Sequence, residues 1–188
     1  MRNLEQELKL KLDEREYGIL ANLTDKEPQL QINYYFTSVH LPKNVMVRIR
    51  QKGDTFLLGY KERLQQSSGV MVCDERECEI SPSYADSLIR RGILQHEINE
   101  MLKTDFYEML TCEGKMETYR TAFDYMNWHF ELDKNLYLDI VDYELECESE
   151  NMQDLYNLKN YLVYKFGIVL KDSKAKSMRF FEAKNAKV

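Results

Sequence analysis

The sequence lacks the features of several large classes of protein. None of its apolar runs is long enough to span a membrane, and its first residues lack the apolar block of a signal peptide. Its four cysteines form no C-x-x-C pair and have no histidine at metal-ligand spacing, which argues against a zinc site or a disulfide framework. We therefore expect a cytoplasmic protein with reduced, mostly buried thiols. With 188 residues and no internal repeat or linker, a single domain over 1–188 is predicted.

An excess of positive charge is also absent, since the formal net charge is -6. An acidic chain repels other polyanions, so we expect neither a general nucleic-acid surface nor an anionic-membrane surface. A basic site for a smaller anion is still compatible with this charge if it is enclosed within the acidic shell. Any anion site should therefore be enclosed, and the sequence leaves a homo-oligomer open.

What the sequence does have is repeated alternation of apolar and polar residues, which is typical of β-strands, together with a few stretches of helical spacing. Strands are predicted at 3–11, 29–37, 45–50, 55–62, 70–80, 106–111, 112–124, 127–133 and 137–148, and helices at 12–23, 83–91, 95–102, 151–166 and 176–183. Short polar turns separate the strands, and closing a sheet removes its exposed edges. These patterns predict an α+β fold of about eight antiparallel strands, closed or nearly closed into a barrel, with flanking helices.

Two arrangements of such strands are compatible with the alternation. If the apolar faces point inward, the charged faces are solvated and the barrel is packed. If the apolar faces point outward, helices must cover them, and the interior becomes a polar cavity where acids face bases. Periodicity alone favours the first arrangement, because packed interiors are the common case for small barrels.

Charged side chains recur along the strands at regular spacing. In chain order they are Glu5-x-Glu7-x-Lys9, Arg48-x-Arg50, Lys61, Glu75 and Glu77, Arg120, Asp133, Glu144-x-Glu146, and Lys176 followed by Arg179. In this order they resemble the charged motifs of the CYTH, or triphosphate tunnel metalloenzyme, family, and the resemblance extends over nearly the whole chain. Lys174 competes with Lys176 for the place of the C-terminal lysine.

The resemblance implies an eight-stranded antiparallel tunnel that holds a triphosphate, usually with Mg²⁺ or Mn²⁺. Guanidinium and ammonium groups match phosphate oxygens, whereas carboxylates hold the hard divalent cation that bridges to phosphate. The implied substrate-binding residues are Lys9, Arg48, Arg50, Lys61, Arg120, Lys176 and Arg179. The implied metal ligands are Glu5, Glu7, Asp133, Glu144 and Glu146.

The implied reaction is metal-dependent hydrolysis of the terminal phosphate of a triphosphate, with inorganic triphosphate, thiamine triphosphate and nucleoside triphosphates as candidate substrates. Glu5, Glu7 and Glu75 are the candidate catalytic carboxylates that orient the attacking water. Two alternatives stay open at this point. One is a non-catalytic module that binds a triphosphate or polyphosphate and reports its occupancy to a partner; the other is an adenylate cyclase.

Overall fold

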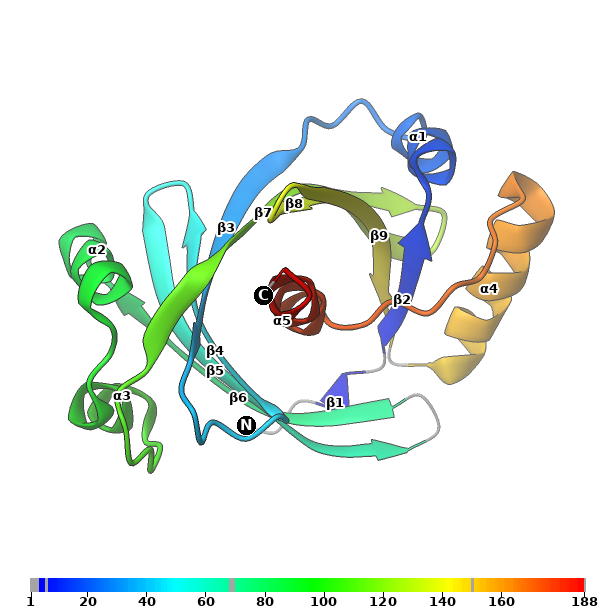
Figure 1. Ribbon diagram of the computed structural model, residues 1–188. Helices are drawn as coiled ribbons and strands as arrows, with labels where there is room; N and C mark the ends of the chain where they lie inside the picture. Colours follow the sequence, from blue (N-terminus) through cyan, green and yellow to red (C-terminus); the bar gives the residue numbers. More distant parts are fainter. Residues whose placement is uncertain (1–3, 6, 68–69, 150, 188) are drawn as a thin grey trace. The chain divides into compact units, whose positions relative to one another are not determined.

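The computed structural model describes residues 4–5, 7–67, 70–149 and 151–187 (Figure 1). Within them the chain forms an antiparallel β-sheet fold with five helices, and the strand order is β1-β6-β5-β4-β3-β7-β8-β9-β2. The chain divides into two compact units. The first contains Gln31–Gln66 and Met71–Met116, and the second contains Glu5–Leu30 and the chain from Glu117 onward.

The first unit contains the greater part of each of four strands, together with two short helices. Its elements are β3 (Gln29–Thr37), β4 (Val45–Lys52), β5 (Thr55–Ser67), β6 (Val70–Ile80), α2 (Pro82–Arg91) and α3 (Gln95–Leu102). The alternation of β4 buries Val47 and Ile49, which pack with Leu88 of α2 and Ile98 of α3 in one apolar cluster. The Ser81 side chain caps α2 by accepting a hydrogen bond from the Tyr84 backbone N–H.

The second unit contains strands that pair in the order β7-β8-β9-β2, with three helices beside them. Its elements are β2 (Glu7–Leu12), α1 (Glu14–Ala21), the later part of β7 (Thr111–Tyr125), β8 (Trp128–Tyr137), β9 (Ile140–Glu148), α4 (Met152–Phe166) and α5 (Lys176–Asn185). The strand β1 (Leu4–Glu5) precedes β2. Figure 1 shows α4 and α5 on opposite sides of β9 and β2.

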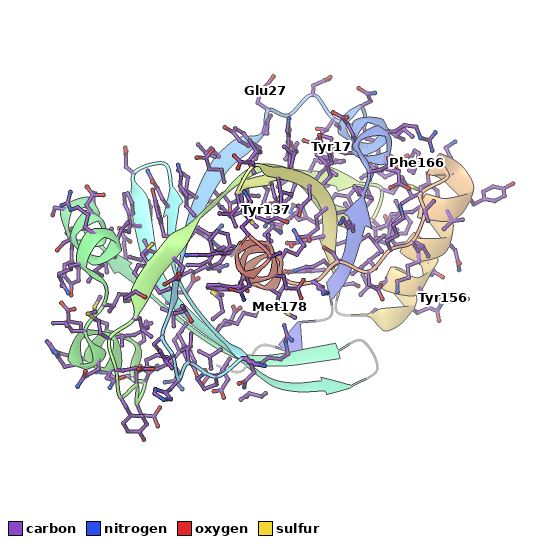
Figure 2. All side chains as sticks on the ribbon, in the orientation of Figure 1. Tyr17, Glu27, Tyr137, Tyr156, Phe166 and Met178 are labelled. Atoms are coloured by element: carbon purple, nitrogen blue, oxygen red, sulfur yellow. The ribbon has the colours of Figure 1, made fainter. Side chains whose placement is uncertain are left out.

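The apolar face of β2 and β9 is covered by helices. Leu10 and Leu145 pack in one cluster with Leu158 and Leu162 of α4 and with Leu20 of α1. Phe166, at the C-terminal end of α4 (Figure 2), extends this cluster, with its ring tilted against that of Tyr125 and edge-to-face with that of Tyr161. The opposite face of β9 carries Glu144, which is fully buried. In this unit the favoured expectation of solvated charges was therefore wrong, and the arrangement with helix-covered apolar faces is the one found.

Other local predictions also needed correction. Residues 106–109 form no strand, and Leu110 makes only an isolated bridge with Ile93. The predicted strand 137–148 begins later, because Leu138 (φ 47°) and Asp139 (φ 66°) form a left-handed hairpin turn between β8 and β9. The strand order ends at β1 and β2, so the described residues show an open series of strands rather than the predicted closed barrel.

The predictions about thiols and membrane spans can also be compared with the structure. Among the described side chains, Cys78, Cys112 and Cys147 form no disulfide, and Cys147 is buried; the Cys73 side chain lies outside the described part. No helix in the described ranges is long and apolar enough to cross a membrane. The single domain and the cytoplasmic location stay predictions from the sequence.

Candidate metal and phosphate site

The pairing of β2 and β8 with β9, and of β7 with β8, brings charged residues from distant parts of the chain onto one face. Lys9 of β2 and Glu131 of β8 lie opposite Glu146 of β9. Asp133 lies opposite both Glu144 of β9 and Arg120 of β7. Because side chains directly opposite each other in an antiparallel pair point to the same side, the register alone assembles an acid and base cluster.

Three carboxylates form the centre of this cluster. One oxygen each from Asp133, Glu144 and Glu146 lie within 4.8 Å of one another, and all three residues are buried. Buried carboxylates are strongly destabilising unless cations or hydrogen-bond donors surround them. The site is therefore a binding site for positive charge, provided by the protein, by a metal ion, or by both.

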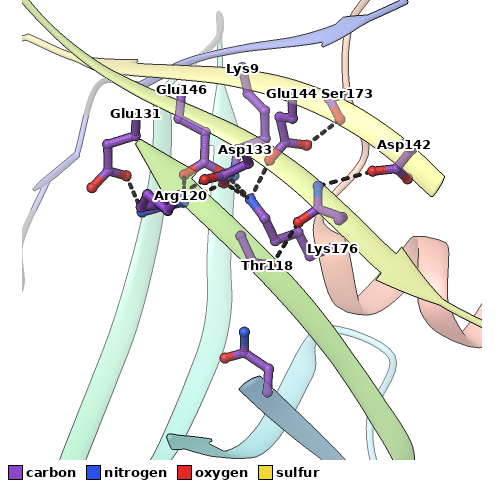
Figure 3. Close-up of polar contacts among 12 residues, drawn as sticks. Lys9, Thr118, Arg120, Glu131, Asp133, Asp142, Glu144, Glu146, Ser173 and Lys176 are labelled. Atoms are coloured by element: carbon purple, nitrogen blue, oxygen red, sulfur yellow. Dashed lines mark hydrogen bonds and ion pairs between the residues drawn. The ribbon is translucent and has the colours of Figure 1, made fainter. Parts of the chain in front are cut away.

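Arg120 and Lys176 supply the first of these positive charges (Figure 3). The Arg120 guanidinium binds Asp133 through two parallel hydrogen bonds of 2.8 and 2.6 Å. It also donates to Glu146 at 2.8 Å and contacts Glu131. The Lys176 Nζ lies 2.8 Å from Asp133 Oδ2 and 2.6 Å from Glu146 Oε1, and it also contacts Glu144 Oε1.

Arg179 anchors the other side of Glu144. Its Nη1 contacts Glu144 Oε2, and it also donates to Ser173 Oγ and to the Lys174 carbonyl. Its Nε lies 3.0 Å from Asp142 Oδ2. The N-terminal turn of α5 therefore contributes two cations to the cluster, since Lys176 begins the helix and Arg179 follows one turn later.

Asp142 is held in turn by a second group of polar side chains. It accepts hydrogen bonds from Asn135 Nδ2 at 2.9 Å and from the Tyr137 hydroxyl at 2.7 Å. Asn135 Oδ1 accepts from Thr118 Oγ1 at 2.7 Å. Burial and the hydrogen bond to Asp142 raise the pKa of Tyr137 to about 12, so its hydroxyl stays a donor. These contacts fix Asp142 as a partner of Arg179.

The cluster shifts the protonation of its members in opposite directions. Burial raises the pKa of Glu144, although Lys176 opposes this shift. Burial also disfavours the charged form of Glu146, but Lys176, Lys9 and Arg120 outweigh it and hold the pKa of Glu146 well below its usual range. Burial alone would lower the pKa of Lys176, yet the surrounding carboxylates raise that pKa above its usual value. Near neutral pH Lys176 and Glu146 are therefore both charged.

Several predicted site residues lie in the first unit, where they form separate contacts. Arg48 Nη2 lies 3.4 Å from Glu77 Oε1, and Lys61 contacts Glu75. Arg50 Nε donates to Asn33 Oδ1 at 3.2 Å. For Glu5 and Glu7 only the backbone is described; their side chains lie outside the described part of the structure.

The structure places the two C-terminal lysines in different surroundings and adds residues that the sequence did not reveal. Lys176 enters the cluster, whereas Lys174 pairs at the surface with Glu182. Ser173, Glu131 and Asp142 join the cluster although none was predicted there. Asp142 could have been predicted from the sequence, because its spacing from Glu144 places both residues on one face of a strand. No sequence pattern pointed to Ser173, because it lies in an irregular segment.

Comparison with known proteins agrees with this geometry. A family model described as the CYTH domain matches residues 3–181. The chain belongs to the CYTH domain family. The resemblance seen in the sequence is thereby confirmed.

Relatives of this CYTH chain cover nearly its whole length. A Bacillus subtilis (strain 168) protein named "Putative triphosphatase YjbK" is 26% identical over 192 residues, which is 98% of this chain and 98% of that protein. A crystal structure from Bacillus halodurans, described as a "putative adenylate cyclase", has 22% identity and a TM-score of 0.75, covering 96% of this chain and 98% of that chain.

A Hippeastrum structure, HpAC1, also has 22% identity and a TM-score of 0.75 and covers 96% of each chain. It is described as a "putative adenylyl cyclase" that shows a dominant triphosphatase activity. At this identity the two solved structures establish a shared fold.

The carboxylates of this CYTH chain fit a divalent metal ion. Mg²⁺ and Mn²⁺ prefer oxygen ligands, and Asp133, Glu144 and Glu146 offer three that already converge. Second contacts also hold these ligands in place: Arg120 binds Asp133, and Arg179 binds Glu144. The three carboxylates therefore suit a hard metal ion. The arginine and lysine side chains around them suit an anion bound to that metal ion.

Proposed function

We propose that this protein is a metal-dependent phosphohydrolase that removes the terminal phosphate from a triphosphate-containing substrate, with Mg²⁺ or Mn²⁺ as cofactor. The observation that carries the proposal is the convergence of Asp133, Glu144 and Glu146 beside basic side chains in a chain of the CYTH family. A cluster that combines both charges suits a metal and phosphate complex, because carboxylates hold the metal while cations bind the phosphate oxygens.

The roles of the protein's own residues follow from their contacts. Asp133, Glu144 and Glu146 would hold the metal ion, which when bound supplies positive charge that stabilises phosphate oxygens. Lys9 and Arg120 would bind phosphate oxygens from the edge of the cluster, since both already contact Glu146. Lys176 and Arg179 would do so from α5, and we assign the same role to Arg48, Arg50 and Lys61 of the first unit.

Attack on the terminal phosphorus requires an oriented water molecule. We propose that a carboxylate among Glu5, Glu7 and Glu75 accepts a hydrogen bond from this water and aligns it with the bond that breaks. Glu5 and Glu7 are further proposed metal ligands. Positioning and charge stabilisation would then account for most of the rate acceleration.

The proposal is tested by measuring phosphate release from inorganic triphosphate, thiamine triphosphate and ATP, each with Mg²⁺, with Mn²⁺ and with chelator. We expect release from at least one substrate that depends on the metal and is lost in Glu144→Gln. The matched control is Glu182→Gln, because Glu182 is exposed and its ion pair with Lys174 lies at the surface. This control should keep wild-type activity.

Two other results would replace the proposal. Cyclic AMP formed from ATP with release of pyrophosphate, detected by chromatography, would make the protein a cyclase. A rise in melting temperature with triphosphate but no turnover of any substrate would make it a binding module.

A further inference from the structure

The ammonium group of Lys176 lies where the three central carboxylates converge. Its Nζ contacts Asp133 Oδ2 at 2.8 Å, Glu146 Oε1 at 2.6 Å, and also Glu144 Oε1. We propose that Lys176 is an internal counter-ion that a divalent cation displaces, and that the displaced ammonium then binds the triphosphate. Metal and triphosphate would thus bind cooperatively. This inference rests on the proposed function and adds a regulatory coupling to it.

The geometry makes the two cations mutually exclusive. Mg²⁺ bonds to carboxylate oxygens at about 2.1 Å, and the ammonium already lies within hydrogen-bond distance of one oxygen from each of the three residues. An ion that bonds to these same oxygens would stand almost where Nζ stands. One cation must therefore leave before the other can bind.

The charge balance gives the same result. The cluster consists of the carboxylates of Glu131, Asp133, Asp142, Glu144 and Glu146 and the cations Lys9, Arg120, Lys176 and Arg179. Acids and bases are thus nearly matched within the protein. A divalent ion added to these five carboxylates and four cations would change the formal charge of the set from -1 to +1, and loss of Lys176 from the carboxylates would remove that excess.

The fold allows Lys176 to move while α5 stays in place. Lys176 is the first residue of α5, and its long, flexible stem can redirect the ammonium by rotation about side-chain bonds alone. Arg179, one turn later, is held by Asp142, Ser173 and the Lys174 carbonyl. The start of the helix thus keeps its anchor when the lysine leaves.

The displacement can be measured without catalysis by labelling lysines with an amine-reactive reagent and quantifying the products by mass spectrometry. The chain provides an internal control, because the Lys174 side chain is 59% exposed and the Lys176 side chain is 14% exposed. We expect slow labelling of Lys176 in chelator, and a rise of about fivefold or more as Mn²⁺ saturates the site. Labelling of Lys174 should stay constant. Adding inorganic triphosphate in excess Mn²⁺ should protect Lys176 again.

A variant provides the second measurement. In Lys176→Met the competing charge is gone while the length of the side chain is nearly kept. We expect Mn²⁺, measured by calorimetry without triphosphate at mildly alkaline pH, to bind about tenfold more tightly than to the wild type. The matched control Lys174→Met should bind Mn²⁺ as the wild type does.

The outcomes separate this inference from the proposed function. Constant Lys176 labelling while Mn²⁺ binds, or equal or weaker Mn²⁺ binding by Lys176→Met, would overturn the displacement whether or not the protein hydrolyses triphosphates. If no triphosphate is hydrolysed but Mn²⁺ still raises Lys176 labelling, the proposed function fails and the displacement stands. Failure of Mn²⁺ to bind either protein would overturn both.

Discussion

Glu144 offers a direct test of the metal site through protein stability. Its side chain is fully buried; Oε2 accepts from Ser173 and Arg179, and Oε1 contacts Lys176. Glu144→Gln keeps the shape but replaces a carboxylate oxygen with an NH₂ group, which cannot accept from these donors. It also removes one of the three converging metal ligands.

The expected magnitudes follow from these contacts. Without metal, one mismatched buried group costs about 1–3 kcal/mol, which lowers the melting temperature of a chain of this length by several degrees. With Mn²⁺ at about one hundred times its Kd, the wild type should gain about 2.7 kcal/mol, because ligand binding stabilises only the folded state. At about 2–4 °C for each kcal/mol, that gain amounts to a rise of about 5–10 °C.

The assay is thermal unfolding of wild type, Glu144→Gln and the control Glu182→Gln, each in chelator and in Mn²⁺. We expect both the wild type and Glu182→Gln to show the Mn²⁺-dependent rise, and Glu144→Gln to show less than a third of it. An equal rise in all three proteins would refute the assignment of Glu144 as a ligand. Glu144→Ala is less informative, because leaving Lys176 and Arg179 short of a buried partner costs about 3–5 kcal/mol and can unfold the protein.

Three further outcomes follow from other contacts. Arg120→Lys loses the two-pronged contact with Asp133, so kcat/KM for phosphate release should fall about 10- to 100-fold while circular dichroism stays unchanged. Leu145→Ala removes a fully buried side chain of β9 and should cost about 2–5 kcal/mol in urea unfolding. Arg91 holds the pKa of Glu97 down to about 2, so their pairing stabilises the fold above the unfolded pKa of about 4.5 and is lost as the pH falls toward 2. Because Arg91 is partly exposed, Arg91→Met should cost about 1 kcal/mol at neutral pH and progressively less below about pH 4.5.

Much of the fold could be predicted because local patterns and tertiary structure agree. The strand β3 and the helix α3 have the boundaries that their residue patterns predicted. The strand predicted at 106–111 was wrong over 106–109, because aromatic and β-branched residues favour strands only when a neighbouring strand is available to pair with. Instead, the Phe106 backbone N–H donates to Asn99 Oδ1, a contact that no periodicity reveals.

The side on which the charges lie could not be predicted from periodicity, and β9 shows why. Asp142 and Glu144 alternate with Tyr143 and Leu145, a pattern that usually means one solvated face. Here the residues on both faces are buried or half-buried, because α4 covers one face and Lys176 of α5 approaches the other. Alternation shows that the two faces of a strand differ in polarity, but it does not show which face is exposed to water.

The burial of these acids explains why the site depends on residues so far apart in the sequence. A strand with three buried carboxylates on one face is stable only if cations reach that face. Arg120 comes from β7, which β8 separates from β9 in the sheet, and Lys176 comes from α5, which follows β9 after the intervening helix α4. The docking of α5 is therefore an electrostatic requirement of β9. Because a divalent ion would meet the same requirement, we propose that the residues that stabilise the fold also make the site responsive to metal.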